Sequence, residues 1–469
     1  MKRRVLLDLS HAGTGYVGIA QETRLIFAML AGLPEVEVTG LLMPMRLHDL
    51  PRLANGGDQV ALVAGILHWM SSTLVPQRRR RSLALLSNAL GLLANRYRAA
   101  PVPPDMLDAV WRSLFQQTLA PSDRSMVLAQ KFLATDASVS RLAYRMVLPT
   151  RRFPVALDVP GFDVAVFCDA RPFRLPPGTQ PVVRYHDAIP LTAPDTVVNW
   201  RSGLGHQRMV QHCDPRTWFV CNSPATVKDL LLADPTREGR TSVIPCVLSP
   251  LQDAPDVSLP SIIAARRTFR SLGGKSAFPP IEDKPRYVLA VSTFEPRKNF
   301  AAVVRAWERV TARHDPDLRL LFVAGKGWLE EDGFRLMAPY VAQGRIIHLQ
   351  GLPPDELQAV MRGAECFAFP SFAEGFGYPP LEALQAGAPV IVSDIPVFRW
   401  SFGDAALFVD PYDVEALAQA MVRLCVSPDR AALRAELASK RDATVARFQP
   451  GAVVGQWQAL LDQFPLNRQ

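Results

Sequence analysis

The sequence predicts an α/β protein with two Rossmann-like domains, each a parallel sheet covered by helices. Short apolar runs alternate with stretches of helical periodicity, which is the pattern of parallel sheets. The alternation restarts after a glycine- and proline-bearing stretch at residues 273–285. The length of 469 residues also exceeds one ordinary core and favours two or three domains.

The first domain is expected to span residues 1–272. Its basic start, MKRRVLLDLS, is interpreted as a first buried strand rather than a signal peptide, because the apolar run stops at Asp8. A glycine-bearing loop, a helix and a second strand follow. Residues 46–151 interrupt the alternation, and we predict that they form a helix-rich insertion.

The second domain is expected to span residues 286–445, after a linker at 273–285. A C-terminal helix within 446–469 is predicted to return to the first domain. Within the second domain, apolar runs predict strands at residues 287–293, 318–325, 345–351, 366–371, 389–394 and 406–411. Helical periodicity predicts helices over residues 299–314 and 354–364, and from residue 414 onward.

Charge and cysteine content narrow the class of protein. The formal net charge is +8 and the pI is about 9.3, which favours an anionic partner or simply a basic, soluble surface. The six cysteines form no C-x-x-C pair, so zinc and a disulfide framework are not expected, and reduced thiols in a cytosolic protein fit better. No apolar run reaches the length of a membrane span.

The richest local signal is SFAEGFGYPPLEALQAG, at residues 371–387, which is typical of a strand end, a loop and a helix. Gly375 and Gly377 permit positive φ angles or the close approach of a ligand. Two prolines follow, and proline suits the first turn of a helix. We therefore expect a helix over PLEALQA that ends at Gly387, with its N-terminus available to a phosphate.

Two glutamates flank this loop at the spacing E-x₇-E. Glu382 is expected in the first helical turn, where its carboxylate could accept hydrogen bonds from ribose hydroxyls. Glu374 precedes the glycines and could accept hydrogen bonds from a second polyol. One alternative is that both are solvated surface acids, one of which favours the helix dipole. A nucleotide-sugar pocket is the interpretation that uses both acids and the helix end between them.

Two further loops place positive charge at the ends of predicted strands. VSTFEPRKNF carries Arg297 and Lys298, and FVAGKGW carries Lys326 between two glycines. An arginine fork and a lysine point charge can together neutralise a diphosphate. Ligands of open parallel sheets bind at the carboxyl ends of the strands, so we expect the site there, in a cleft between the two domains.

These motifs resemble the retaining glycosyltransferases of the large GT-B family 4, and especially the mannosyltransferase-like branch of bacterial surface polysaccharide assembly. The resemblance is strong over residues 287–411, where EPRKN, GKGW, EGFGYPPLE, SDIPVFR and GDAALFVDP carry it. In the first half, GTGYVGIA, YHDAIPL and FVCNSPATVKDLL are similar to family segments. The resemblance implies a GT-B fold, a nucleotide-sugar donor bound by the second domain, and no required metal or other cofactor.

The resemblance also implies roles for residues of the second domain. Glu382 would hold the donor ribose. Glu374 would meet the transferred sugar, with the backbone of Phe376 and Gly377 beside it. Lys326 would belong to the donor-binding set.

The remaining implied roles concern the diphosphate and the first domain. Arg297 and Lys298 would hold the diphosphate, and His186, in YHD, would face the reacting sugar. A buried, hydrogen-bonded core histidine is the alternative for His186, and Asp187 beside it is expected only to cap a turn. The first loop would lie near the diphosphate and the acceptor through its glycines, Gly13, Gly15 and Gly18.

One position departs from the branch pattern. The branch usually has PVFREV-x-GD, whereas this chain has PVFRWSFGD, so Trp400 stands where a glutamate is usual. The departure bears on fine donor or inter-domain contacts and leaves Glu374 and Glu382 unchanged.

The resemblance implies transfer of a hexose from a nucleotide sugar with retention, by same-face attack with the leaving phosphate as base. The resemblance favours GDP-mannose as donor, with UDP-glucose next, and a glycan or lipid-linked oligosaccharide as acceptor. Alternatives are a nucleotide-sugar epimerase or a phosphorylase on the same fold, or a catalytically silent basic adaptor that binds membranes. Nucleic-acid binding is not expected, because no aromatic residues are interleaved with the arginines at 78–81.

A basic segment raises the question of membrane contact. In RRRRSLALLSNALGLLANRYR, leucines recur at helical spacing between Arg78–Arg81 and Arg96–Arg98. A basic amphipathic helix can lie on an anionic bilayer. The alternative is that the leucine stripe packs inside the first domain. The expected location is the cytoplasm, with peripheral contact to the inner face of the plasma membrane.

Overall fold

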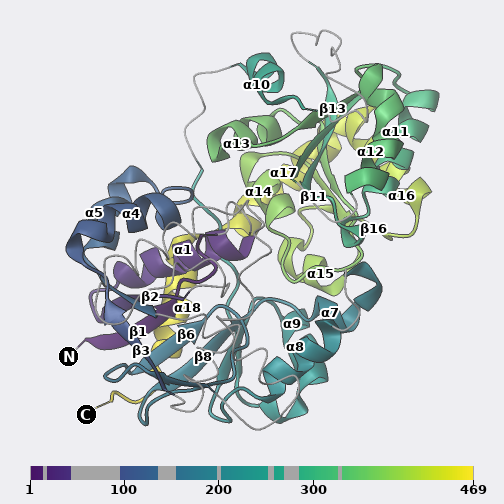
Figure 1. Ribbon diagram of the computed structural model, residues 1–469. Helices are drawn as coiled ribbons and strands as arrows, with labels where there is room; N and C mark the ends of the chain where they lie inside the picture. The colour runs from purple at the N-terminus through teal and green to yellow at the C-terminus, as the bar shows by residue number, and fades with distance from the viewer. Residues whose placement is uncertain are drawn as a thin grey trace, which may run out of the picture. The chain divides into compact units, whose positions relative to one another are not determined.

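The structure is a computed structural model that describes two compact α/β units. The described residues are 2–13, 18–43, 96–135, 155–197, 202–251, 258–268, 285–325 and 330–467. Unit 1 comprises Met1–Leu191, Arg201–Ser249 and Pro450–Gln469, and unit 2 comprises Thr192–Trp200 and Pro250–Gln449. Each unit contains one mostly parallel sheet with helices around it, as the sequence predicts (Figure 1).

The sheet of unit 1 has ten strands in the order β10-β9-β8-β6-β1-β2-β4-β3-β5-β7. Its strands are parallel except where β3 runs antiparallel to β4. The strands are β1 (Arg3–Asp8), β2 (Val36–Leu42), β3 (Arg96–Pro101), β4 (Lys131–Thr135), β5 (Val155–Asp158), β6 (Val164–Phe167), β7 (Phe173–Arg174), β8 (Gln180–Tyr185), β9 (Trp218–Cys221) and β10 (Thr241–Val243). The predicted first strand is confirmed, and its buried second half lies between β2 and β6.

The helices of unit 1 cover this sheet. They are α1 (Gly18–Ala31), α4 (Leu107–Val110), α5 (Arg124–Leu128), α7 (Ile189–Thr192), α8 (Ser202–Gln211), α9 (Pro224–Ala233) and α18 (Pro450–Asp462). Ile26, Phe27 and Leu30 of α1 point into the same core as Trp457 and Leu461 of α18. Figure 1 shows the two helices, purple and yellow, side by side, so the last helix of the chain completes this core.

The predicted helix-rich insertion at 46–151 is described only at residues 96–135, where short helices between residues 104 and 128 lie between two strands. Residues 96–135 begin and end with strands, and β4 extends the main sheet by pairing with β2. The stretch Arg96–Arg98, predicted to end a basic helix, lies in β3. Tertiary pairing overrides local periodicity here, since a strand can form wherever a neighbouring edge is open. The predicted segment at residues 78–95 lies outside the described residues.

The sheet of unit 2 has six parallel strands in the order β13-β12-β11-β14-β15-β16. They are β11 (Tyr287–Thr293), β12 (Arg319–Gly325), β13 (Ile346–Leu349), β14 (Cys366–Phe369), β15 (Val390–Ser393) and β16 (Leu407–Val409). The helices are α10 (Leu259–Arg266), α11 (Phe300–Arg313), α12 (Glu330–Ala342), α13 (Pro354–Arg362), α14 (Tyr378–Ala386), α15 (Pro396–Phe402), α16 (Val414–Cys425) and α17 (Arg430–Ala446). Every strand predicted in this half is present, with boundaries shifted by a few residues.

Amphipathic helices explain why this sheet is buried on both faces. Val303, Trp307 and Val310 recur at helical spacing in α11 and are all buried against the sheet. The Trp307 indole N–H donates to the Leu318 carbonyl at 2.9 Å, which fixes α11 to the start of β12. Figure 1 shows α11, α12 and α16 on one side of the sheet and α13 and α14 on the other. The strands therefore read as nearly continuous apolar runs.

The division of the chain falls earlier than the predicted domain boundary at residue 272. Helix α10 belongs to unit 2, where Arg266 makes two hydrogen bonds to the Glu356 carboxylate of α13, at 2.6 and 2.8 Å. The predicted linker at 273–285 lies outside the described residues except for Pro285. Residues 450–469 belong to unit 1.

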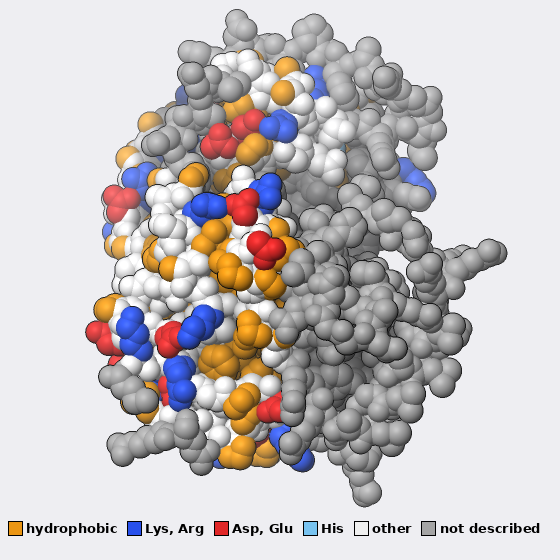
Figure 2. Space-filling view, turned by 60° about the vertical axis from the view of Figure 1, so that its left-hand side comes forward, with side chains coloured by type: hydrophobic (Ala, Val, Ile, Leu, Met, Phe, Trp, Pro, Cys, Tyr) orange, Lys and Arg blue, Asp and Glu red, His pale blue; other side chains and the backbone are white. Residues whose placement is uncertain are grey.

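The described surface mixes both signs of charge. Figure 2 shows basic side chains next to acidic ones on the face it presents, and the ion pairs Lys131–Glu37 and Arg124–Asp108 are examples from unit 1. Among the described helices, we find no segment with the length and apolar character that crossing a bilayer requires.

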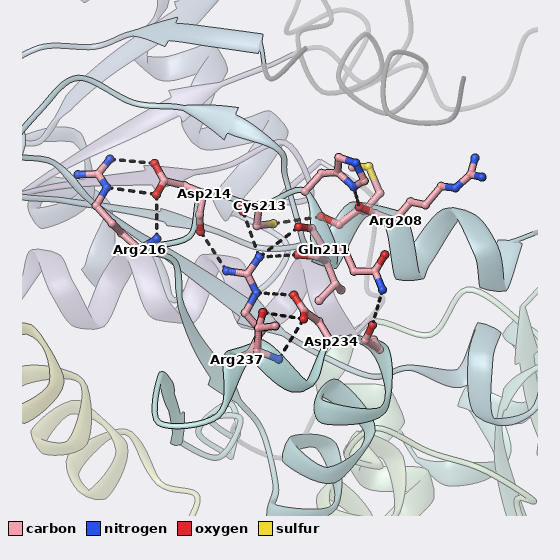
Figure 3. A network of polar contacts seen from close by, with 12 residues as sticks. Arg208, Gln211, Cys213, Asp214, Arg216, Asp234 and Arg237 are labelled. Carbon is pink, nitrogen blue, oxygen red and sulfur yellow. Dashed lines mark hydrogen bonds and ion pairs between the residues drawn. The ribbon is translucent and has the colours of Figure 1, made fainter. Parts of the chain in front are cut away.

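Arg237 organises a buried polar network in unit 1 (Figure 3). Its Nε donates to Asp234 Oδ2 at 2.8 Å. Its two terminal nitrogens donate to backbone carbonyls at and after the end of α8, including those of Val210, Cys213 and Asp214, each at 3.1 Å. One guanidinium thus ties together several carbonyls at and after the end of a helix, two of which, those of Val210 and Asp214, also accept a backbone hydrogen bond.

We predict that Arg237→Ala destabilises unit 1 by about 3–5 kcal/mol, because it removes the cation that pairs with the buried Asp234 carboxylate and several hydrogen bonds to carbonyls. Arg216→Ala is the matched control, since Arg216 forms a half-exposed pair with Asp214 that is worth about 1 kcal/mol or less. Scanning calorimetry measures the unfolding transition of each variant and of the wild type. Equal losses in the two variants would contradict the role assigned to Arg237.

Candidate functional site

The loops after β11 and β14 in unit 2 are joined by a buried charge cluster. Arg297 Nη1 donates to Glu374 Oε2 at 2.7 Å, and Lys298 Nζ donates to Glu374 Oε1 at 2.6 Å. Arg297 Nε also donates to Glu295 Oε2 at 2.8 Å. Three of the predicted site residues thus meet at the carboxyl end of the sheet.

Backbone hydrogen bonds hold the same two loops together. The Phe372 N–H donates to the Arg297 carbonyl at 2.8 Å. Asn299, in the left-handed conformation at φ 54°, donates from its side-chain amide to the carbonyls of Pro370 and Pro411 at 3.1 and 2.7 Å. The loops after β11, β14 and β16 are therefore fixed relative to one another.

Burial and charge act against each other in this cluster. The side chains of Lys298 and Glu374 are only 8% and 6% exposed. Burial would raise the pKa of Glu374, but the adjacent Arg297 and Lys298 outweigh burial and hold that pKa below its usual value. Burial lowers the pKa of Lys298 although Glu374 opposes the shift. The Lys298 ammonium also lies 4.9 Å from the centre of the Phe369 ring, a favourable cation–π contact.

Helix α14 begins directly after the glycine loop. Gly377 is its N-cap, with φ 89°, and a β-carbon there would lie 2.4 Å from Cε1 of Phe398. Only glycine fits both constraints. The helix ends at Gly387, as predicted, with φ 98°.

The position of Glu382 corrects one expectation. The helix starts at Tyr378 rather than at the prolines, so Glu382 lies in its second turn and the first turn carries no acid. The reason is that the left-handed Gly377 already turns the chain into the helix, and the two prolines fill the next positions. Glu382 is half-buried.

Phe376 lies beside this helix start and is buried. Lys326 lies outside the described residues, so the predicted third basic loop has no structural account. Gly13 is a buried turn residue of unit 1 and Gly18 begins α1, whereas Gly15 lies outside the described residues.

His186 follows β8 in unit 1 and is held by buried charges. Its Nδ1 lies 3.3 Å from Glu22 Oε2, and Glu22 forms an ion pair with the fully buried Arg184. Its Nε2 is buried with no hydrogen-bond partner among the described residues. Burial lowers the pKa of His186, with Glu22 opposing, which favours the neutral imidazole. Asp187 Oδ1 accepts from the Ile189 N–H at 3.0 Å, as a turn cap does.

Sequence reasoning missed a second polar cluster at the carboxyl ends of β1 and β6. Asp8 Oδ1 accepts hydrogen bonds from the N–H and hydroxyl of Ser10 at 2.8 and 2.6 Å. Asp169 Oδ2 lies 3.2 Å from His11 Nε2, and Arg171 pairs with Asp169. Burial raises the pKa of Asp8, whereas Arg171 and His11 outweigh burial and lower that of Asp169. The signal that could have predicted this cluster is the aspartate at the end of each apolar run, Asp8 and Asp169.

The chemistry of the unit 2 cluster suits an anion. Two held cations and the positive end of a helix dipole can stabilise negative charge that appears on a phosphate. No group of three or more histidine, cysteine, aspartate or glutamate side chains with the geometry of a metal site occurs in the part of the chain that the structure describes.

Comparison with known proteins finds similarity in the second half of the chain. Residues 275–441 match the model of the family described as Glycosyl transferases group 1. The O-antigen chain mannosyltransferase B of Escherichia coli is 34% identical over 131 residues, which cover 28% of this chain and 34% of that protein. The O-antigen chain mannosyltransferase RfbU of Salmonella typhimurium is 30% identical over 158 residues, which cover 33% of this chain and 43% of that protein. The chain thus spans less than half the length of either curated relative.

A solved structure extends the likeness to both units. The sucrose-phosphate synthase from Thermosynechococcus elongatus has a TM-score of 0.55 at 16% identity, and the match covers 98% of this chain and 99% of that one. At this identity the likeness shows the fold. The chain therefore has the GT-B fold, and its residues 275–441 match the model of the glycosyl transferases group 1 family.

Proposed function

We propose that this chain is a retaining glycosyltransferase that moves a hexose, mannose in the first instance, from a nucleotide sugar to a glycan or lipid-linked acceptor. The observation that carries the proposal is the buried cluster of Arg297, Lys298 and Glu374. Glu374 lies four residues before the start of α14, and the cluster lies inside the region that matches the family. The names of both curated relatives, O-antigen chain mannosyltransferases, support mannose.

The proposed donor site assigns the diphosphate to the two cations and to the N-terminus of α14. Glu374 holds both cations in place, and its carboxylate, which can accept about four hydrogen bonds, is assigned to a hydroxyl of the sugar. Glu382 receives the ribose hydroxyls from the second turn of the same helix. The site so defined requires no metal ion and no further cofactor.

In the proposed reaction, the bond between the anomeric carbon and the diphosphate oxygen breaks while an acceptor hydroxyl oxygen bonds to the same face of that carbon. The hydroxyl proton passes to the leaving phosphate. Arg297, Lys298 and the positive end of the α14 dipole stabilise the negative charge that develops on the leaving group. His186 is assigned to the reacting sugar, for which its unpartnered, neutral Nε2 is suited.

We predict that Glu382→Ala weakens donor binding by about tenfold or more, since it removes a charged hydrogen-bond acceptor. Lys298→Met should reduce turnover by about 100-fold, because it removes one preorganised cation from the leaving group. Calorimetric titration with donor and a product assay measure the two effects. Glu436→Ala, at an exposed position of α17, is the control and should behave as wild type.

Near-wild-type binding and turnover in both site variants would contradict the assignment of Glu382 and Lys298 to the donor site. Because Lys298 is buried against Glu374, its loss also affects folding, so thermal unfolding is recorded for each variant. Glu374→Gln is the companion variant: it keeps the side-chain shape and an acceptor oxygen but lacks the charge that both cations require. A folded Glu374→Gln protein with full turnover would exclude the cluster from the reaction.

We predict that GDP binds more tightly than UDP and that GDP-mannose is the preferred donor. The reason is the likeness to O-antigen mannosyltransferases, since the described residues themselves do not select a base. Calorimetry with GDP, UDP, GDP-mannose and UDP-glucose decides between them. Tighter binding of UDP would replace mannose with another hexose and leave the transferase proposal intact.

We further propose that the protein works in the cytoplasm, on the inner face of the plasma membrane, where a lipid-linked acceptor would be available. The four arginines at 78–81 are the basis, because an exposed basic residue near an anionic bilayer contributes about 1 kcal/mol. They lie outside the described residues, so this proposal rests on sequence alone.

Co-sedimentation with anionic liposomes tests the membrane proposal. We expect binding at low salt that weakens at high salt, and weaker binding when Arg78–Arg81 are changed to serine. Neutral liposomes are the control. A wild-type protein that ignores anionic liposomes at low salt would show that the acceptor reaches the site without this segment.

A further inference from the structure

The surroundings of Trp400 in unit 2 indicate a use for its ring. Trp400 lies on α15, the short helix that follows β15, and is half-buried. Its ring meets that of Phe448 edge to face, with centroids 6.1 Å apart. The Arg447 guanidinium lies 5.0 Å from the centre of the indole, and its Nη1 donates to the Trp400 carbonyl at 3.0 Å.

The contact continues from Phe448 to the glycine loop. Phe448 is fully buried, and its ring meets that of Phe376 edge to face, with centroids 5.5 Å apart. Phe376 in turn packs against Tyr378, the first residue of α14, at 5.3 Å. An unbroken row of rings thus runs from Trp400 to the start of the helix that we assign to the donor.

Helix α15 touches the same loop a second time. Phe398, two residues before Trp400, occupies the space that a side chain at Gly377 would need. The Phe398 ring also meets Phe369, which lies under the Lys298 ammonium. The loop is therefore braced from one helix at Gly377 directly and at Phe376 through Phe448.

A glutamate at position 400 could pair with Arg447, but it has no ring to pack against Phe448. A well-packed ring row resists displacement because each lost contact forfeits dispersion energy with no replacement. Phe448 is also the last residue but one before the chain leaves unit 2 for unit 1. The row therefore fixes the loop to the segment where the chain crosses between units.

We propose that Trp400 is a positioning residue: through Phe448 it holds Phe376, and with it the backbone of residues 375–378, in the conformation that receives the transferred sugar. That Trp400 holds the loop follows from the contacts alone. That the loop receives the transferred sugar rests on the proposed function. Trp400 itself is not assigned a contact with the donor.

The first test needs no ligand and so does not depend on the proposed function. Hydrogen exchange of the 375–378 amides is measured in the full chain as wild type, Trp400→Ala, Trp400→Phe and Trp400→Glu. We expect about tenfold faster exchange in the alanine and glutamate variants and near-wild-type exchange in the phenylalanine variant, which keeps a ring. Arg399→Ala is the control, since Arg399 lies next to Trp400 on α15 but pairs outward with the exposed Asp394.

The second test separates positioning from general damage. Dissociation constants for GDP and for GDP-mannose are measured for the same variants. Trp400→Ala should weaken GDP-mannose binding about tenfold more than it weakens GDP binding, because GDP keeps its assigned contacts with Arg297 and Lys298 whereas the sugar depends on the 375–378 backbone. A purely structural role would weaken both ligands equally, or neither.

Three outcomes would overturn the inference. The first is unchanged hydrogen exchange of the 375–378 amides in Trp400→Ala. The second is wild-type exchange and binding in Trp400→Glu, which would assign the role to pairing with Arg447. The third is an equal loss of affinity for GDP and GDP-mannose in Trp400→Ala. A wild-type protein that binds neither nucleotide but shows the expected exchange pattern would remove the proposed donor while leaving the bracing of the loop by Trp400 in place.

Discussion

The carboxylate of Glu374, held between Arg297 and Lys298, is the interaction on which the arrangement of the C-terminal sheet edge depends. All three groups are largely withdrawn from water, and an unpaired charge in such a place costs several kcal/mol. Glu374 is therefore not stable there without the two cations, and Lys298 is not stable there without Glu374. Because the cations follow β11 and the acid follows β14, the ion pairs also fix the distance between two loops that the sheet alone would leave free.

The geometry beneath that cluster explains why the glycines are needed. The chain must leave β14, place Glu374 against the cations, and enter α14 within a few residues. Gly377 makes the turn with φ 89°, in contact with the Phe398 ring. A larger residue would strain the turn and displace α15 at once, so the helix start, the cation pair and the aromatic packing form one unit.

The sequence predicted the second half well because its signals are local. Continuous apolar runs, a strongly amphipathic α11 and glycine at both ends of α14 each identify an element without knowledge of its neighbours. The sequence did not predict strands whose formation depends on pairing with a neighbour. Strand β4 pairs with the edge of β2, and β3 pairs with β4. Sequence reasoning also missed Glu22, a buried acid inside an amphipathic helix, since nothing in its neighbourhood shows that Arg184, 162 residues later, is its partner.

The charge balance of the cluster bears on how a donor would be recognised. Arg297 and Lys298 face Glu374 and Glu295, so two cations and two anions already neutralise one another. A diphosphate would not be drawn in by unbalanced charge. It would instead meet hydrogen-bond donors of the protein whose positions are already fixed. Such an arrangement stabilises charge that develops late in a reaction rather than charge already present in the substrate. Tight packing behind the loop, from Phe369 and Phe398 to Phe448, is then what keeps those positions fixed.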